Sequence, residues 1–269
     1  MSTVTSKDGT TIAFDAVGSG RPLIMIDGAT AYRAVNPLNA QTGELLADEF
    51  RTYAYDRRGR GESTDTAPYA IEREIEDVAA LVEDAGGGPA VIFGWSSGGV
   101  LALDVAASGL VPVSHVAVFE PPFVVDDTRP PLPSDYVEKL DAAVAAGDPG
   151  EAVAIFMTDA SGGSREDVEG LKQSDFWPIM LGIAPTIAYD GRIMGTTMSG
   201  NPLPADRWAS ITVPVLAMHG IDTWPTLIPG PKALAELLPT ATLKPVPGEN
   251  HATTPEVLAP TLREFVREA

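Results

Sequence analysis

A serine framed by glycines is the feature of this sequence with the clearest chemical meaning. Ser96 is the central residue of the pattern formed by Gly94, Ser96 and Gly98. The apolar run 90–93 precedes the pattern, and a helical run, 100–107, follows it. A tight strand-to-helix turn of this kind lifts its central side chain above the sheet edge, at the N-terminus of a helix. The sequence therefore predicts that Ser96 is a nucleophile.

The neighbouring Ser97 is an alternative nucleophile, but it does not sit at the centre of the glycine frame. A backbone N–H directly after the nucleophile is well suited to hold a developing oxyanion. We therefore expect Ser97 to donate its amide to an oxyanion hole.

A serine nucleophile needs a general base, and imidazole has a suitable pKa. The chain has three histidines. His115 lies near the start of an expected strand, away from Ser96, and His219 ends an apolar strand, as a packed core residue would. His251 lies in a Gly/Asn loop before the last expected helix, the order typical of Ser…acid…His enzymes. We predict His251 to be the base.

The apolar patterns of the chain predict a mostly parallel sheet covered by helices on both faces. The expected strands are 11–17, 22–27, 52–56, 90–93, 113–119 and 213–218, and the expected helices are 71–84, 98–108 and 255–268. Thr254 is a candidate N-cap of the last helix, whose first turn holds Pro255. The whole chain, 1–269, is expected to be one α/β domain.

Residues 123–207 have a different texture. They begin with a cluster of prolines, followed by helical patterns at 135–146, 149–158 and 165–174 and by an irregular stretch rich in Met, Gly and Trp. No strand pattern occurs there. We expect a helical cap that lies over the sheet and sets the choice of substrate.

Taken in order, these features resemble the α/β-hydrolase fold superfamily over nearly the whole chain. Leu23–Gly28 resembles its strand and oxyanion loop, Asp56–Ser63 resembles its D-x-R-G-x-G-x-S turn, and 248–251 resembles its histidine loop. The resemblance implies that the amide of Ala29 is the second oxyanion donor. Asp27 stands where many relatives carry histidine, and we expect its carboxylate to turn away from the site, toward the Asp56–Arg60 loop.

Two carboxylates are candidates for the acid that orients His251. Asp222 follows a late strand, where the family usually places the acid, although its spacing from Gly220 is one residue short. Glu120 follows an earlier strand directly, and Pro121 and Pro122 hold the chain extended after it. Some relatives, including zearalenone-lactonase-like hydrolases, take the acid from that strand. We place Glu120 slightly ahead of Asp222; either would hold the tautomer of His251.

Other residues suggest how a ligand is held. The basic cluster Arg57, Arg58 and Arg60 either binds an anion or, as we favour, forms a structural turn with local ion pairs. Met and aromatic residues supply an apolar pocket or simply fill the core. The residues that we expect to contact substrate are Gly28, Trp95, Phe123 and Trp177.

Composition narrows the remaining options. Asp and Glu total 37 against 18 Lys and Arg, a net charge of −19, which disfavours nucleic acid and anionic membranes as partners. The chain has no cysteine and no histidine cluster at ligand spacing, so we expect neither disulfide nor metal. No signal peptide or membrane-length apolar run is evident, so a cytoplasmic location is the expectation. The oligomeric state stays open, with a homodimer as one option.

These observations predict a cofactor-free hydrolase of a hydrophobic small-molecule ester or lactone, acting through an acyl-enzyme. Two alternatives stay open. One is a cofactor-free haloperoxidase-like enzyme or carbon–carbon bond hydrolase that uses the same residues. The other is a ligand-binding protein with an idle triad, suggested by the unusual Asp27.

Overall fold

A single eight-stranded sheet forms the centre of the computed structural model, which describes residues 2–268. The strand order is β1-β2-β4-β3-β5-β6-β7-β8, and all neighbours from β4 to β8 run parallel. Only the hairpin β1-β2 is antiparallel to its neighbours. The strands are β1 (Ser2–Thr5), β2 (Thr11–Val17), β3 (Arg21–Ile26), β4 (Phe50–Tyr55), β5 (Ala90–Trp95), β6 (Val113–Phe119), β7 (Val215–Asp222) and β8 (Ala241–Glu249).

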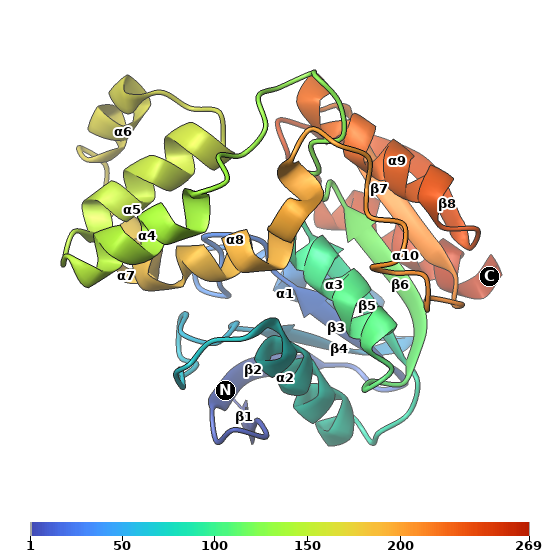
Figure 1. Cartoon of the computed structure of the whole chain (residues 1–269). Helices are drawn as coiled ribbons and strands as arrows, with labels where there is room; N and C mark the ends of the chain where they lie inside the picture. The colour runs from blue at the N-terminus through green and yellow to red at the C-terminus, as the bar shows by residue number, and fades with distance from the viewer. Residues whose placement is uncertain (1, 269) are drawn as a thin grey trace.

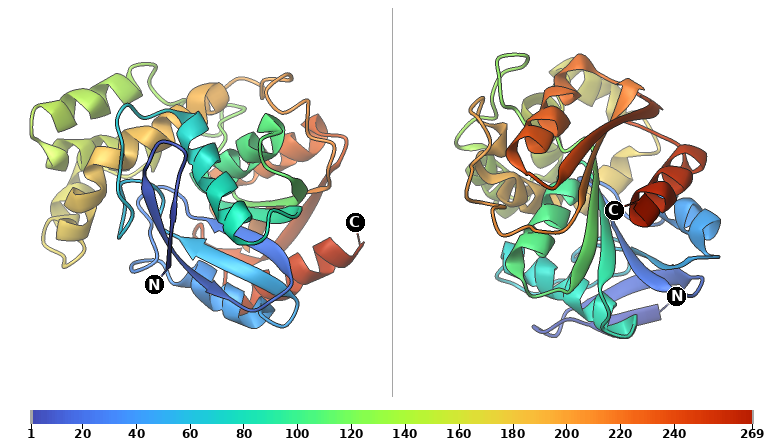
Figure 2. Two further views of the ribbon diagram at one scale, coloured as in Figure 1. Left: turned by 90° about the horizontal axis from the view of Figure 1, so that it is seen from below. Right: turned by 90° about the vertical axis from the view of Figure 1, so that its right-hand side faces the viewer.

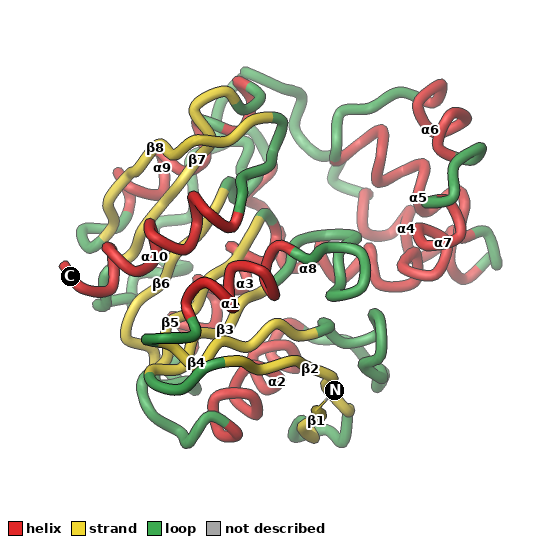
Figure 3. Tube along the Cα trace, turned by 180° about the vertical axis from the view of Figure 1, so that it is seen from behind, coloured by secondary structure: helices red, strands yellow, loops and turns green. Residues whose placement is uncertain are grey.

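Helices cover both faces of this sheet (Figures 1 and 2). One face carries α2 (Ile71–Asp84), α3 (Ser97–Ser108) and α9 (Pro229–Leu237), and the other carries α1 (Leu38–Leu46) and α10 (Pro255–Glu268). Figure 3 shows α1 and α10 side by side in the view from behind. In β3, Ile24 packs toward the first face and Leu23 toward the second. Burial on both faces explains why these strands read as continuous apolar runs.

Residues 120–214, all of them described, contain helices and loops but no strand. The helices are α4 (Tyr136–Ala145), α5 (Pro149–Ile155), α6 (Arg165–Leu171), α7 (Trp177–Ile183) and α8 (Ile187–Met194), with a π-helical turn at Phe156–Ala160. Helices α4–α7 lie to one side of the sheet in Figure 1, and α8 leads back from them toward α3. They share an apolar core of their own, which includes Leu140, Val153 and Ile187.

The predicted strands and helices are present, with bounds that differ by a few residues at most. The helices α1, α7, α8 and α9 and the strands β1 and β8 were not expected from the sequence. β8 contains Pro245 and Pro247, which lack a backbone donor, and proline is tolerated in an edge strand such as this one. α1 contains Gly43, where a Cβ would lie 2.5 Å from Thr52 Oγ1, so close packing against β4 explains the glycine.

The basic cluster after β4 ties the sheet to its surroundings by buried ion pairs. Arg58 donates two hydrogen bonds to Asp77 of α2, at 2.7 and 2.8 Å, and a third to Asp8 at 2.9 Å. Arg57 donates two to Glu74 of α2, both at 2.7 Å. The cluster therefore forms the local ion pairs of a structural turn. Among residues 2–268, no helix is both long and apolar enough to span a membrane.

Replacing Arg58 with methionine is expected to lower the free energy of unfolding by about 3–5 kcal/mol, because Asp77 would be left buried without its partner. The control is Arg73→Met, which removes a partly exposed pair with Glu76 and is expected to cost less than about 1 kcal/mol. Urea unfolding followed by circular dichroism measures both. Equal losses in the two variants would contradict the structural role given to Arg58.

Candidate active site

The turn between β5 and α3 holds Ser96 in a strained conformation, with φ 57° and ψ −127°. Glycine is required on both sides of the turn. A Cβ at Gly94 would lie 2.1 Å from the Gly98 carbonyl oxygen, and a Cβ at Gly98 would lie 2.5 Å from the Ile26 carbonyl oxygen. The close approach of α3 to two strands therefore enforces the glycine frame that the sequence showed around Ser96.

His251 and Glu120 meet at the same edge of the sheet. The Nδ1 atom of His251 lies 2.6 Å from Oε2 of Glu120, and the other oxygen, Oε1, accepts a hydrogen bond of 2.7 Å from the Gly220 N–H. Glu120 is fully buried just beyond β6, and its N–H bonds the Met218 carbonyl oxygen at 2.9 Å. A carboxylate at Nδ1 keeps the proton on that nitrogen and leaves Nε2 free to accept one.

The other candidates for acid and base lie elsewhere. Asp222 is exposed at the end of β7, and the structure does not bring its carboxylate to His251. His219 is buried, with Nδ1 2.9 Å from the Gly220 carbonyl oxygen. His115 packs edge-on against Phe265 of α10. Of the acid and base candidates, only Glu120 and His251 are in contact.

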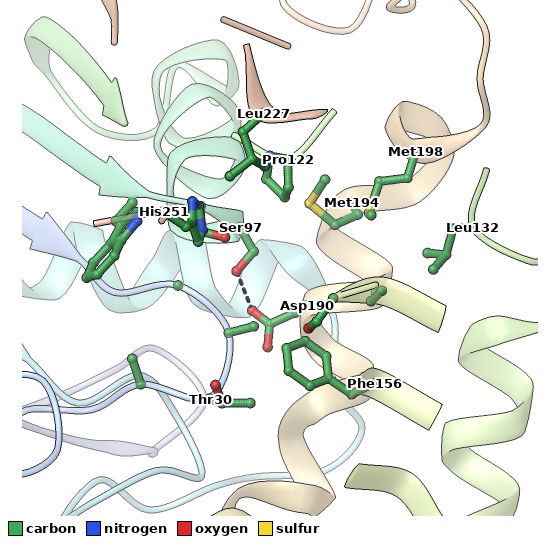
Figure 4. Close-up of a pocket in the computed structure, with 18 of the residues that line it drawn as sticks. Thr30, Ser97, Pro122, Leu132, Phe156, Asp190, Met194, Met198, Leu227 and His251 are labelled. Atoms are coloured by element: carbon green, nitrogen blue, oxygen red, sulfur yellow. Dashed lines mark hydrogen bonds between the residues drawn. The ribbon is translucent and has the colours of Figure 1, made fainter. Parts of the chain in front are cut away.

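A cavity of about 420 Å³ lies between the sheet edge and the helical segment (Figure 4). Ser96, Ser97, His251 and the loop residues 28–31 line it on the sheet side. The helical side is mainly apolar and includes Phe156, Phe176, Met194 and Met198.

Two of the four expected substrate contacts, Gly28 and Trp95, line this cavity, whereas Phe123 and Trp177 do not. Phe123 is buried in the main core against Trp208, with ring centroids 5.5 Å apart. Trp177 packs with the smaller core, beneath the Lys172 ammonium group. Phe123 and Trp177 therefore pack in apolar cores, and their contact with substrate stays a prediction that the lining of this cavity does not support. Phe176, the residue before Trp177, faces the cavity instead.

The loop after β3 passes directly against Ser96, since a Cβ on Gly28 would lie 2.9 Å from the Ser96 Cβ. The Gly28 carbonyl oxygen accepts a hydrogen bond of 2.9 Å from Arg60 Nη1. In a trans peptide the N–H of the next residue points opposite to the carbonyl. The Arg60 contact therefore turns the Ala29 N–H away from Arg60 and fixes the orientation of this peptide.

The Asp27 carboxylate accepts a hydrogen bond of 2.7 Å from Asn36 Nδ2. The Asp27 carbonyl oxygen accepts a hydrogen bond of 3.5 Å from Arg57 Nη1, and no hydrogen bond described within residues 2–268 joins the carboxylate itself to the Asp56–Arg60 loop, so the expected direction of this carboxylate stays a prediction. Burial raises the pKa of Asp27 to about 7, although the Asn36 bond and the charges of Arg60 and Arg57 lower it.

Asp190 of α8 is a site residue that sequence reasoning missed. Its carboxylate accepts a hydrogen bond of 2.8 Å from Ser97 Oγ (Figure 4). It also accepts one of 2.6 Å from Arg57 Nη1 and one from Arg60. Burial raises the pKa of Asp190, but the charges of Arg57 and Arg60 outweigh it and lower the pKa to about 2. The available signal was an acidic residue within an apolar helical stretch. Within residues 2–268, no group of three or more His, Asp or Glu side chains is arranged to hold a metal ion.

Replacing Asp27 with asparagine is expected to stabilise the protein more at pH 8 than at pH 5. The carboxyl keeps its proton up to about pH 7 when folded, and its ordinary pKa is 3.8. Between these values the unfolded chain loses the proton first, so stability falls as pH rises, by at most about 4 kcal/mol. The variant lacks this loss. Urea unfolding at pH 5 and pH 8 measures the difference in the free energy of unfolding, and Asp222→Asn, at an exposed position, is the control. A gain in stability that is the same at both pH values would contradict the raised pKa of Asp27.

Comparison with known proteins places this geometry in a family. The model of the Alpha/beta hydrolase family matches residues 18–261. The chain is 32% identical to a non-heme chloroperoxidase of Streptomyces lividans, over 99% of this chain and 100% of the relative. It is 29% identical to a bifunctional esterase/perhydrolase of Acinetobacter calcoaceticus, over 99% and 100%. The crystal structure of an alpha/beta hydrolase from Sphaerobacter thermophilus superposes with a TM-score of 0.86 and 44% identity, covering 98% of this chain and 99% of that one. The chain therefore belongs to the alpha/beta hydrolase family.

Proposed function

We propose that this hydrolase cleaves a carboxylic ester or lactone through an acyl-enzyme on Ser96. The observation that carries the proposal is the 2.6 Å contact between His251 and the buried Glu120, because His251 lines the same cavity as Ser96. A nucleophile, a base and an orienting acid at one sheet edge are the groups that acyl transfer requires.

In this mechanism the Ser96 hydroxyl attacks the substrate carbonyl carbon while His251 Nε2 accepts its proton. Glu120 stabilises the imidazolium that forms. The oxyanion accepts hydrogen bonds from the N–H groups of Ala29 and Ser97. The Ser97 N–H lies in the first turn of α3 and has no intrahelical acceptor, which leaves it available for this role.

His251 next gives its proton to the leaving alcohol oxygen, and the carbon–oxygen bond breaks. A water molecule then attacks the acyl-enzyme, with His251 accepting its proton, and the acid and free Ser96 are released. Nothing in these steps requires a metal or an organic cofactor.

The helical segment 123–207 acts in this proposal as the cap that selects the substrate. It supplies the apolar wall of the cavity, with Phe156, Phe176 and Met194 among its members. A wall of this kind favours a small molecule with a hydrophobic portion. The esterase named among the relatives supports ester cleavage as the first choice.

Perhydrolysis or haloperoxidase-like activity is the second candidate, favoured by the names of the two relatives described above. It shares the acyl-enzyme, but hydrogen peroxide replaces water in the second step and releases a peracid. Assaying one ester with and without peroxide, and titrating peracid, separates the two activities.

Replacing Ser96 with alanine should abolish turnover of any short aryl ester that the wild-type protein hydrolyses. It should also abolish covalent labelling by a fluorophosphonate, read by mass spectrometry of the intact chain. Ser114→Ala is the matched control, because that hydroxyl bonds the Ala90 carbonyl oxygen outside the cavity. Full labelling of the Ser96 variant would exclude Ser96 as the nucleophile.

Glu120→Gln is expected to lower kcat by about 10³- to 10⁴-fold, because the amide cannot hold the same His251 tautomer or stabilise the imidazolium. Asp222→Asn, which changes the other candidate acid, should leave kcat within about twofold because Asp222 is exposed and apart from His251. Circular dichroism of both variants is the control for correct folding. The reverse pattern of losses would assign the acid to Asp222.

A further inference from the structure

One arginine in the wall of the cavity has no acidic partner. Arg129 lies in the loop between β6 and α4 and lines the cavity together with Leu132 of the same loop. Its Nη2 donates a hydrogen bond of 2.9 Å to the Ala160 carbonyl oxygen, at the end of the π-helical turn. That neutral acceptor occupies one of the five N–H donors of the guanidinium.

Among residues 2–268, this arginine is an exception. Every other arginine that is partly or fully buried forms an ion pair with a carboxylate: Arg33, Arg51, Arg57, Arg58, Arg60, Arg73, Arg192, Arg207 and Arg263. The chain carries 37 acidic residues against 18 basic ones. Acidic partners are thus abundant in the sequence, yet none is placed beside Arg129.

The charge of Arg129 is therefore not balanced by the protein. Burial lowers the pKa of Arg129, and no neighbouring carboxylate opposes that effect. The group still stays charged at neutral pH, because a guanidinium is not deprotonated in proteins. A partly desolvated cation with free donors binds an anion favourably, and its planar fork matches a carboxylate in particular.

The aspartate and histidine side chains that line the cavity already have partners. Asp190 is held by Arg57 and Arg60, and His251 contacts Glu120. Apolar side chains make up much of the remaining wall, and Figure 4 places two of them, Leu132 and Met198, on the side away from His251. The cavity thus combines a nucleophile, an apolar wall and one unpaired cation.

We propose that Arg129 binds a carboxylate of the substrate, so that the preferred substrate is an ester or lactone with a free carboxylate beyond an apolar spacer. This inference rests on the proposed function, because it adds a binding group to the same cavity. In it Arg129 acts on binding and selectivity, and the bond-breaking steps stay with Ser96 and His251.

The test compares monomethyl and dimethyl esters of linear dicarboxylic acids of increasing chain length, which share a carbon skeleton and differ in one charge. For the wild-type protein, kcat/KM is expected to be higher for a monomethyl ester of one length than for its dimethyl counterpart. Arg129→Met should lower kcat/KM for that monomethyl ester by about 10- to 100-fold and leave the dimethyl ester within about threefold. Arg129→Lys should restore part of the loss. The control is Arg51→Met, a partly buried arginine outside the cavity that pairs with Asp84.

Equal losses on both esters, or no loss on either, would overturn the carboxylate site while leaving ester hydrolysis intact. If the wild-type protein hydrolyses neither series, the proposed function fails. The role of Arg129 is then tested by measuring how tightly the monomethyl esters bind. Calorimetric titration of the monomethyl esters into Ser96→Ala, and into the same variant with Arg129→Met, needs no turnover. At least tenfold weaker binding in the second protein supports the site. Equal affinities, or no detectable binding to either protein, contradict it.

Discussion

The carboxylate of Asp190 joins the helical segment to the sheet, and the shape of the cavity depends on this contact. The Asp190 side chain comes from α8, and its carboxylate accepts hydrogen bonds from Arg57 and Arg60 after β4 and from the Ser97 hydroxyl at the start of α3. Removing Asp190 would leave the buried Arg60 without its carboxylate partner, which is strongly destabilising, while Arg57 would keep Glu74. The network also extends to the loop after β3, because Arg60 fixes the Gly28 carbonyl. One carboxylate thus connects the helical wall of the cavity with the turn at Ser96 and, through Arg60, with the loop after β3.

Backbone strain is concentrated where chemistry is proposed. Ser96, Glu120, Asn250 and His251 all have φ between 47° and 63°, a region that residues with a side chain rarely adopt. Such conformations persist only where the surroundings enforce them. The parallel sheet does so here, with the Ser96 N–H bonded to the Phe119 carbonyl oxygen and the Glu120 N–H to that of Met218. The rigid sheet edge therefore presents groups that a flexible loop would not hold in place.

Much of this arrangement could be predicted from sequence because its signals are local. The glycines that frame Ser96 stand beside it in the chain and form a pattern that can be read directly, although the contact that requires Gly98 comes from Ile26 in β3. The choice between Glu120 and Asp222 as the partner of His251 could not be made from sequence, because both residues follow strands. Only the three-dimensional path of the chain shows which carboxylate reaches the imidazole. The packing of Phe123 and Trp177 in apolar cores rather than along the cavity was also not visible in the sequence. An aromatic ring carries no sign of whether it faces a core or a cavity, and Asp190 finds its partners more than 90 positions away.

The position of Glu120 has a consequence for the opposite wall. In the proposed mechanism the acid comes from the end of β6, so the segment after β7 does not have to supply one. That segment instead contributes Trp224, Thr226 and Leu227 to the lining of the cavity. Trp224 also stacks on His251, with ring centroids 6.2 Å apart, so Thr226 and Leu227 are the positions where mutation can reshape this wall for new ligands without removing a ring contact of His251. The residues that shape this wall are thus different from the residues proposed to carry out the reaction.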